Sequence, residues 1–120
     1  MQNHYETTVI ITPVLSEEDV KLTIQAHLDF LKANGSEIIQ EDYWGLRKLA
    51  YPIKNKTTGI YFVTEFKGPS DIIDKLELNL RRDENVLRFL TVKLDKYAIE
   101  YNDKRRKGLI GKKKEKTENS

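Results

Sequence analysis

The sequence predicts an α+β fold in which the elements follow the order β-α-β-β-α-β. Runs rich in β-branched and aromatic residues alternate with two segments whose apolar residues recur at helical spacing. Proline, glycine and asparagine separate these runs, as expected for turns and helix ends. The length of 120 residues suits one compact domain with a short extension. Each predicted element has its own local signal.

The first half of the chain predicts a strand, a helix and a second strand. Residues 5–12 are rich in β-branched side chains and stop at Pro13, which favours a strand. Ser16 can cap a helix through its hydroxyl, and apolar residues then recur at helical spacing until Gly35. Residues 37–53 follow as a long strand.

The second half repeats the pattern in the order strand, helix and strand. Residues 55–59 predict a turn, after which the apolar run 60–66 returns as the third strand. Pro69 predicts the start of a second helix, because proline is tolerated in a helix's first turn, and an apolar stripe at helical spacing follows it. Residues 85–94 predict the fourth strand.

This order predicts a ferredoxin-like fold, with a four-stranded antiparallel sheet and both helices on one face. Each β-α-β half leaves space for a strand between its own two, and the central hairpin joins the halves. The other sheet face is then uncovered. By alternation we expect Ile10, Val63, Leu87 and Phe89 on that face. Such a face is typical of a binding surface, although an ordinary mixed surface would show the same pattern.

The charge is unevenly distributed along the chain. Residues 1–102 hold 13 cations and 16 carboxylates, whereas residues 103–120 hold eight cations and three carboxylates. This asymmetry indicates a polyanionic partner contacted partly through the extension, although a tail that only aids solubility would look alike. No apolar periodicity follows Ile110, so we expect a folded domain over 1–102 and a disordered basic tail over 103–120.

Composition argues against several functional classes. The chain has no cysteine and two histidines, which leaves no thiolate chemistry and no multi-histidine metal site. No apolar run approaches the ~20 residues that span a bilayer. His27 falls within the first helix's apolar stripe and is expected to be a core residue. We therefore expect a cytoplasmic protein with no enzymatic activity, cofactor, metal, membrane partner or small-molecule substrate.

Basic residues near apolar and aromatic neighbours favour RNA binding. They occur at the end of the second strand, in the last turn of the second helix and on the fourth strand: Arg47, Lys48, Arg81, Arg82, Arg88 and Lys93. Guanidinium and ammonium groups bind phosphate, and a guanidinium can also stack on a base. Alternatively, cations at a helix C-terminus stabilise its dipole, and strand cations keep an edge soluble.

Three separated motifs occur in order along the chain: Trp44–Ile53, which contains Gly-Leu-Arg-Lys-Leu-Ala-Tyr-Pro-Ile, then Gly59–Phe62, and Leu80–Arg88. Together they resemble the bacterial small-subunit ribosomal protein six family. The opening Tyr5-Glu6 before a β-branched strand is also similar to that family. The resemblance covers residues 4–97. It implies a structural component of the small ribosomal subunit that binds small-subunit rRNA together with small-subunit ribosomal protein eighteen.

The resemblance implies that RNA is bound at the positions that match the family, which are Tyr5, Arg81 and Arg88, with Lys93 following on the same strand. The charge of the tail predicts further RNA contacts at Lys104, Arg105, Arg106 and Lys107. The apolar residues expected on the uncovered face would bind the protein partner.

Two other functions are possible on this fold but fit the sequence less well. A stand-alone single-stranded nucleic-acid binder would need a Lys/Arg-Gly-aromatic-Gly/Ala-Phe pattern, of which residues 59–63 supply only a fragment. A small enzyme would need a nucleophile or base arrangement that the sequence does not offer.

Overall fold

The computed structural model describes residues 2–106, and Met1 and residues 107–120 lie outside that description. The elements are β1 (Gln2–Ile11), α1 (Glu17–Ala33), β2 (Glu37–Ile53), β3 (Lys56–Pro69), α2 (Ile72–Arg82), β4 (Val86–Lys93) and α3 (Lys96–Arg106). The first six confirm the predicted order of strands and helices. The helix α3 was not predicted.

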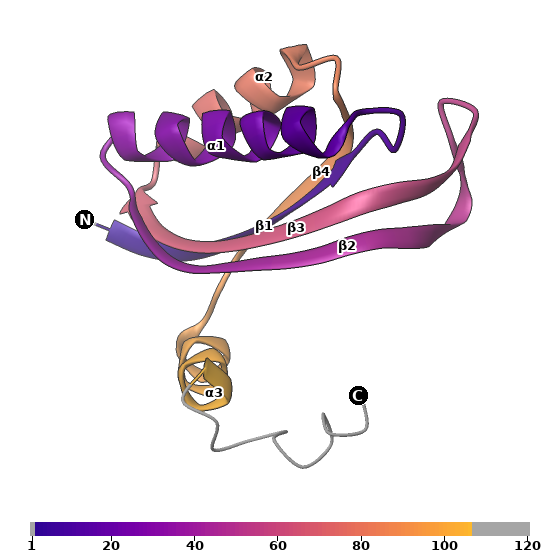
Figure 1. Ribbon diagram of the computed structural model, residues 1–120. Helices are drawn as coiled ribbons and strands as arrows, with labels where there is room; N and C mark the ends of the chain where they lie inside the picture. Colours follow the sequence, from indigo (N-terminus) through magenta and orange to yellow (C-terminus); the bar gives the residue numbers. More distant parts are fainter. Residues whose placement is uncertain (1, 107–120) are drawn as a thin grey trace.

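The four strands form one sheet in the order β2-β3-β1-β4, and every neighbouring pair is antiparallel. Helices α1 and α2 cover one face of this sheet, and α3 lies on the opposite side (Figure 1). The predicted ferredoxin-like fold is confirmed. We refer to the face under α1 and α2 as the covered face and to the other as the uncovered face.

Local signals explain the start of α1 and the turn of the central hairpin. The Ser16 hydroxyl accepts a hydrogen bond from the Asp19 amide at 3.1 Å, which caps α1 as predicted. The turn between β2 and β3 consists of Lys54 and Asn55, whose φ angles are 49° and 67°. These angles suit a two-residue type I′ hairpin turn. The turn predicted at 55–59 is therefore wrong, because β3 already begins at Lys56.

The main core lies between the covered face and the two helices. Alternate β1 residues point into it, including Tyr5, Val9 and Ile11, and they meet Phe66 of β3. Phe66 is fully buried, as are Leu31 of α1 and Leu76 of α2. Burial of this apolar surface is the largest favourable contribution to the stability of such a domain.

A β-bulge changes which β4 residues face the helices. Ile10 pairs with Arg88 and Ile11 pairs with Val86, so Leu87 has no partner in β1. Residues directly opposite each other in an antiparallel pair share a face, and Phe89 lies opposite Val9 of the core. The prediction that Phe89 lies on the uncovered face is therefore wrong.

The predicted boundary between domain and tail also changes. Helix α3 crosses residues 102 and 103, so residues 103–106 are helical and belong to an ordered element. Asp95 caps the start of this helix, because its carboxylate accepts a hydrogen bond from the Ala98 amide at 2.8 Å. The rest of the predicted tail, 107–120, lies outside the described residues.

Candidate partner and nucleic-acid interface

The uncovered face has its most exposed apolar side chains on β4. Leu90 lies opposite Thr8 and is 64% exposed, and Val92 lies opposite Glu6 and is 42% exposed. β4 is an edge strand of the sheet, so one side of its backbone has no partner strand among the described residues. Two exposed aliphatic groups beside such an edge are suited to contact with another protein.

Of the four residues predicted to bind a partner, two lie on the uncovered face. Ile10 is half-buried there, and Val63 lies opposite Thr8 but is only 8% exposed. Leu87 is buried at the bulge, and Phe89 packs against the core. The exposed apolar residues of β4 are therefore Leu90 and Val92, not Leu87 and Phe89. Alternation along β4 would have predicted these two residues only if the position of the bulge were known.

Carboxylates occupy the middle of the uncovered face. Burial raises the pKa of Glu6, and the nearby Glu65 and Asp42 raise it further, whereas Arg105 of α3 lowers it. His4 Nδ1 lies 3.9 Å from the Glu65 carboxylate. Because Glu65 and Asp42 place negative charge beside Glu6, a cationic group on this face would be stabilised.

Aromatic rings lie farther along the same face, toward the hairpin. The Trp44 and Tyr61 rings are stacked, with centroids 6.0 Å apart and an interplanar angle of 10°. The Trp44 indole N–H donates a hydrogen bond to Asp42 at 3.0 Å, which fixes the ring's orientation. Trp44 itself has no partner in β3, because it lies at a second register shift, next to Gly45.

Arginine and lysine side chains lie along β4 and the adjoining helix end. We call Arg81, Arg88 and Lys93 the β4-edge cations, and all three are exposed. The Arg81 guanidinium carbon lies 5.7 Å from the centre of the Phe89 ring, next to the covered face. Arg88 lies on the uncovered face, opposite Ile10. The cations are therefore on both sides of one sheet edge rather than in a single flat patch.

Arg88 also contacts the far end of the central hairpin. Its Nη1 donates a hydrogen bond to the Tyr51 hydroxyl at 2.8 Å, and its guanidinium carbon lies 5.8 Å from that ring's centre. Tyr51 belongs to β2, which forms the opposite edge of the sheet from β4. This contact therefore joins the end of the hairpin to the other edge across the uncovered face.

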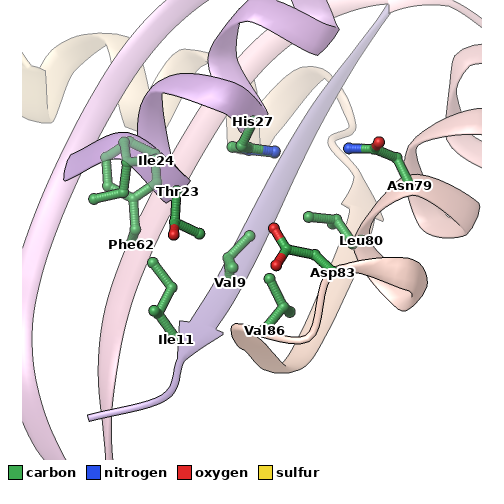
Figure 2. Close-up of a pocket in the computed structure, with 10 residues that line it drawn as sticks. All are labelled: Val9, Ile11, Thr23, Ile24, His27, Phe62, Asn79, Leu80, Asp83 and Val86. Carbon is green, nitrogen blue, oxygen red and sulfur yellow. The ribbon is translucent and has the colours of Figure 1, made fainter. Parts of the chain in front are cut away.

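The core contains a histidine beside a small cavity between α1, α2 and the sheet (Figure 2). Burial lowers the pKa of His27 to about 4, so the ring is neutral at physiological pH. Its Nε2 lies 3.4 Å from the Thr64 hydroxyl, and its ring meets Phe62 edge to face. The cavity volume of about 10 Å³ suits at most one water molecule. The predicted core position of His27 is confirmed.

Comparison with known proteins identifies the family. The family model described as ribosomal protein S6 matches residues 4–93. The chain belongs to the ribosomal protein S6 family.

Individual relatives agree with this assignment. The small ribosomal subunit protein bS6 of Bacteroides thetaiotaomicron is 54% identical over 113 residues, covering 94% of this chain and 99% of that protein. The bS6 protein of Parabacteroides distasonis is 57% identical over 104 residues, covering 87% and 88%. The crystal structure of 30S ribosomal protein S6 from Thermotoga maritima has a TM-score of 0.76 at 25% identity, covering 90% and 98%. The chain is thus a ribosomal protein of the small subunit.

Within this S6-family chain, one predicted RNA-binding residue belongs to the core. Tyr5 is 6% exposed, and its ring packs on Phe66 with centroids 5.6 Å apart. Its hydroxyl accepts a hydrogen bond from the Asn3 side chain at 3.2 Å. The ring is not accessible in this arrangement, which argues against the prediction that Tyr5 binds RNA.

The tail cations predicted to bind RNA have different positions. Lys104 and Arg105 are exposed on α3, and Arg105 also acts on Glu6 and lies 5.9 Å from the Tyr101 ring centre. Arg106 is the last residue of α3, and Lys107 lies outside the described residues. Of these four cations, Lys104 and Arg105 are therefore the two that the structure places as exposed.

Within residues 2–106, no helix has the length and apolarity needed to cross a bilayer. In the same part of the chain, no three histidine or carboxylate side chains are grouped so that they could hold a metal ion.

Proposed function

We propose that this S6-family protein binds small-subunit rRNA together with small-subunit ribosomal protein eighteen, as a non-catalytic, ribosome-bound protein of the cytoplasm. The observation that carries this proposal is the pairing of exposed apolar and basic groups along one sheet edge. Leu90 and Val92 offer apolar contact on the uncovered face, and the β4-edge cations offer phosphate contact beside them.

The charge distribution supports a joint interface with a basic protein. Residues 1–106, up to the end of α3, hold 16 cations and 17 carboxylates, so the field of this region attracts RNA weakly. Glu65 and Asp42 lie close enough to Glu6 on the uncovered face to raise its pKa. A basic partner seated there would relieve this repulsion and add positive field toward RNA.

Binding to small-subunit rRNA across a salt series tests the proposal. The full chain alone should bind weakly at physiological salt, and addition of protein eighteen should strengthen binding. Changing Arg81 and Lys93 together to alanine should reduce the slope of log K against log salt by about one for each phosphate that is no longer neutralised. The matched control changes Lys21 and Lys75, which are exposed on α1 and α2, and should leave the slope unchanged.

Three results would contradict the proposal. Tight binding by the isolated chain would show that no partner is needed. Equal salt slopes for the Arg81/Lys93 variant and the wild type would show that these cations do not contact phosphate. Failure of the wild-type chain to sediment with small subunits at moderate salt would contradict the proposal that the protein is ribosome-bound.

We further propose that the basic segment 107–120 adds contacts with phosphate that do not depend on base sequence. It contains five lysines and two carboxylates, all beyond the end of α3. Deleting it should preserve the free energy of unfolding and flatten the salt dependence of binding to small subunits. An unchanged slope would assign the segment to solubility or to protein contact.

A further inference from the structure

The end of the β2–β3 hairpin forms a pocket with β1 and β4 on the uncovered face. Its walls include three large aliphatic side chains, two tyrosine rings and a guanidinium: Ile10, Leu49, Ile53, Tyr51, Tyr61 and Arg88. Gly59 makes the close packing here possible, because an added Cβ would overlap the Ile10 side chain. The pocket lies at the opposite end of β4 from Val92, outside the apolar site proposed above.

The Tyr51 ring is held in place in the free protein. Its hydroxyl accepts the 2.8 Å hydrogen bond from Arg88, while the residue remains 56% exposed. The guanidinium carbon also lies 5.8 Å from the ring centre, so Arg88 holds the ring in place while more than half of Tyr51 stays exposed. An exposed aromatic ring that is already ordered loses little further conformational entropy when a ligand stacks on it.

The hairpin that presents this ring is strongly basic. Between Asp42 and Glu65 the sequence has four cations and no carboxylate: Arg47, Lys48, Lys54 and Lys56. Within residues 2–106, none of the four forms an ion pair. The rest of residues 1–102 has nine cations against 16 carboxylates, so the hairpin is a positive extension of an acidic domain.

We infer that this pocket receives an unpaired nucleotide of RNA, with its base against Tyr51 and the flanking phosphates on the hairpin cations. The inference rests on the proposed function and adds a second RNA contact to it, which shares Arg88 with the β4-edge cations. Aromatic rings and arginine planes are the groups on which proteins stack splayed-out RNA bases. The four cations favour a polyanion over an apolar peptide, which would leave them without partners. Because the pocket wall is mainly apolar, we expect stacking with little discrimination between bases.

Binding of a short single-stranded oligoadenylate to the full chain tests the inference. Tyr51→Leu keeps an apolar side chain but removes the ring, and should weaken binding about fivefold or more. Tyr51→Phe keeps the ring but removes the hydroxyl that Arg88 holds, so its affinity should fall between the two. The matched control is Tyr97→Leu, at an exposed tyrosine of α3, and should bind as the wild type does. A duplex of equal length should be insensitive to all three changes.

Position in the assembled particle is tested separately, with small subunits that contain the wild-type chain. Ultraviolet irradiation followed by mass spectrometry should identify a nucleotide attached to the hairpin peptide that contains Tyr51. This measurement needs no variant, so it does not depend on how a substitution affects folding.

The outcomes separate the inference from the proposed function. Equal oligoadenylate affinity for wild type and Tyr51→Leu would overturn the inference, even if both chains enter small subunits. Weakened binding of protein eighteen by Tyr51→Leu, with unchanged oligoadenylate binding, would assign the pocket to a protein side chain and overturn it as well. If the wild-type chain does not enter small subunits, the proposed function fails whatever the oligoadenylate result.

Discussion

The two faces of the sheet differ in what they bury. Phe66 on the covered face is fully enclosed by α1 and α2, and its ring contacts Tyr5. On the uncovered face Leu90 is largely exposed and the half-buried Glu6 lies near other carboxylates. One face therefore provides most of the stability of the domain, and the other keeps apolar and charged groups accessible for assembly.

The largest expected effect is a loss of stability from the covered face. Phe66→Ala should lower the free energy of unfolding by about 3–5 kcal/mol, because it removes buried apolar area and leaves a cavity. Val92→Ala on the uncovered face should change it by less than about 0.5 kcal/mol. Denaturant unfolding of both variants measures the difference. Similar losses would show that the two faces contribute alike.

Acidification should also act through the covered face. The pKa of His27 falls from 6.5 in the unfolded chain to about 4 in the folded protein, so the unfolded state binds the proton first. The neutral His27 ring therefore leaves the free energy of unfolding undiminished above pH 6.5. As the pH falls from 6.5 toward 4, protonation of the unfolded chain lowers that free energy by about 3 kcal/mol.

Comparison of the wild type with His27→Gln isolates this contribution. The wild-type advantage in free energy of unfolding should shrink between pH 7 and pH 4, while carboxylates such as Glu6 affect both chains equally. Parallel stability curves for the two chains would mean that the pKa of His27 is the same in the folded and unfolded states, which would contradict this account.

Adjacent residues of β4 allow a sharper test of the comparison. Phe89 packs against the core and Leu90 points to the uncovered face. Phe89→Ala should lower the free energy of unfolding by about 2 kcal/mol, and Leu90→Ala by less than about 0.5 kcal/mol. The reverse order, measured by thermal or denaturant unfolding, would show that the bulge does not set the facing of β4.

Most of the fold followed from local sequence signals. Ser16 at the start of α1 and the apolar stripes of both helices placed the covered face correctly. The error at Phe89 arose because one unpaired residue, Leu87, reverses the alternation after it, and a bulge has no strong composition of its own. The facing of a strand is therefore predictable only where its register is known.

The unpredicted α3 and the buried position of Tyr5 have other causes. Helix α3 has many charged residues and no clear apolar stripe, so periodicity could not reveal it, although Asp95 is a capping residue. Tyr5 was assigned by family resemblance rather than by alternation, which would have placed it with Val9 in the core. The contact between Arg88 and Tyr51 joins opposite sheet edges, and no sequence-local rule predicts such a long-range pair.

The most direct test is the affinity of small-subunit ribosomal protein eighteen for the Leu90→Asp variant of the full chain, measured by calorimetry with the thermal midpoint as control. A charge placed on the exposed apolar part of the uncovered face should weaken binding roughly tenfold or more, because it would be desolvated at the interface. The midpoint should stay close to that of the wild type. Unchanged affinity at an unchanged midpoint would contradict the assignment of the uncovered face to the partner.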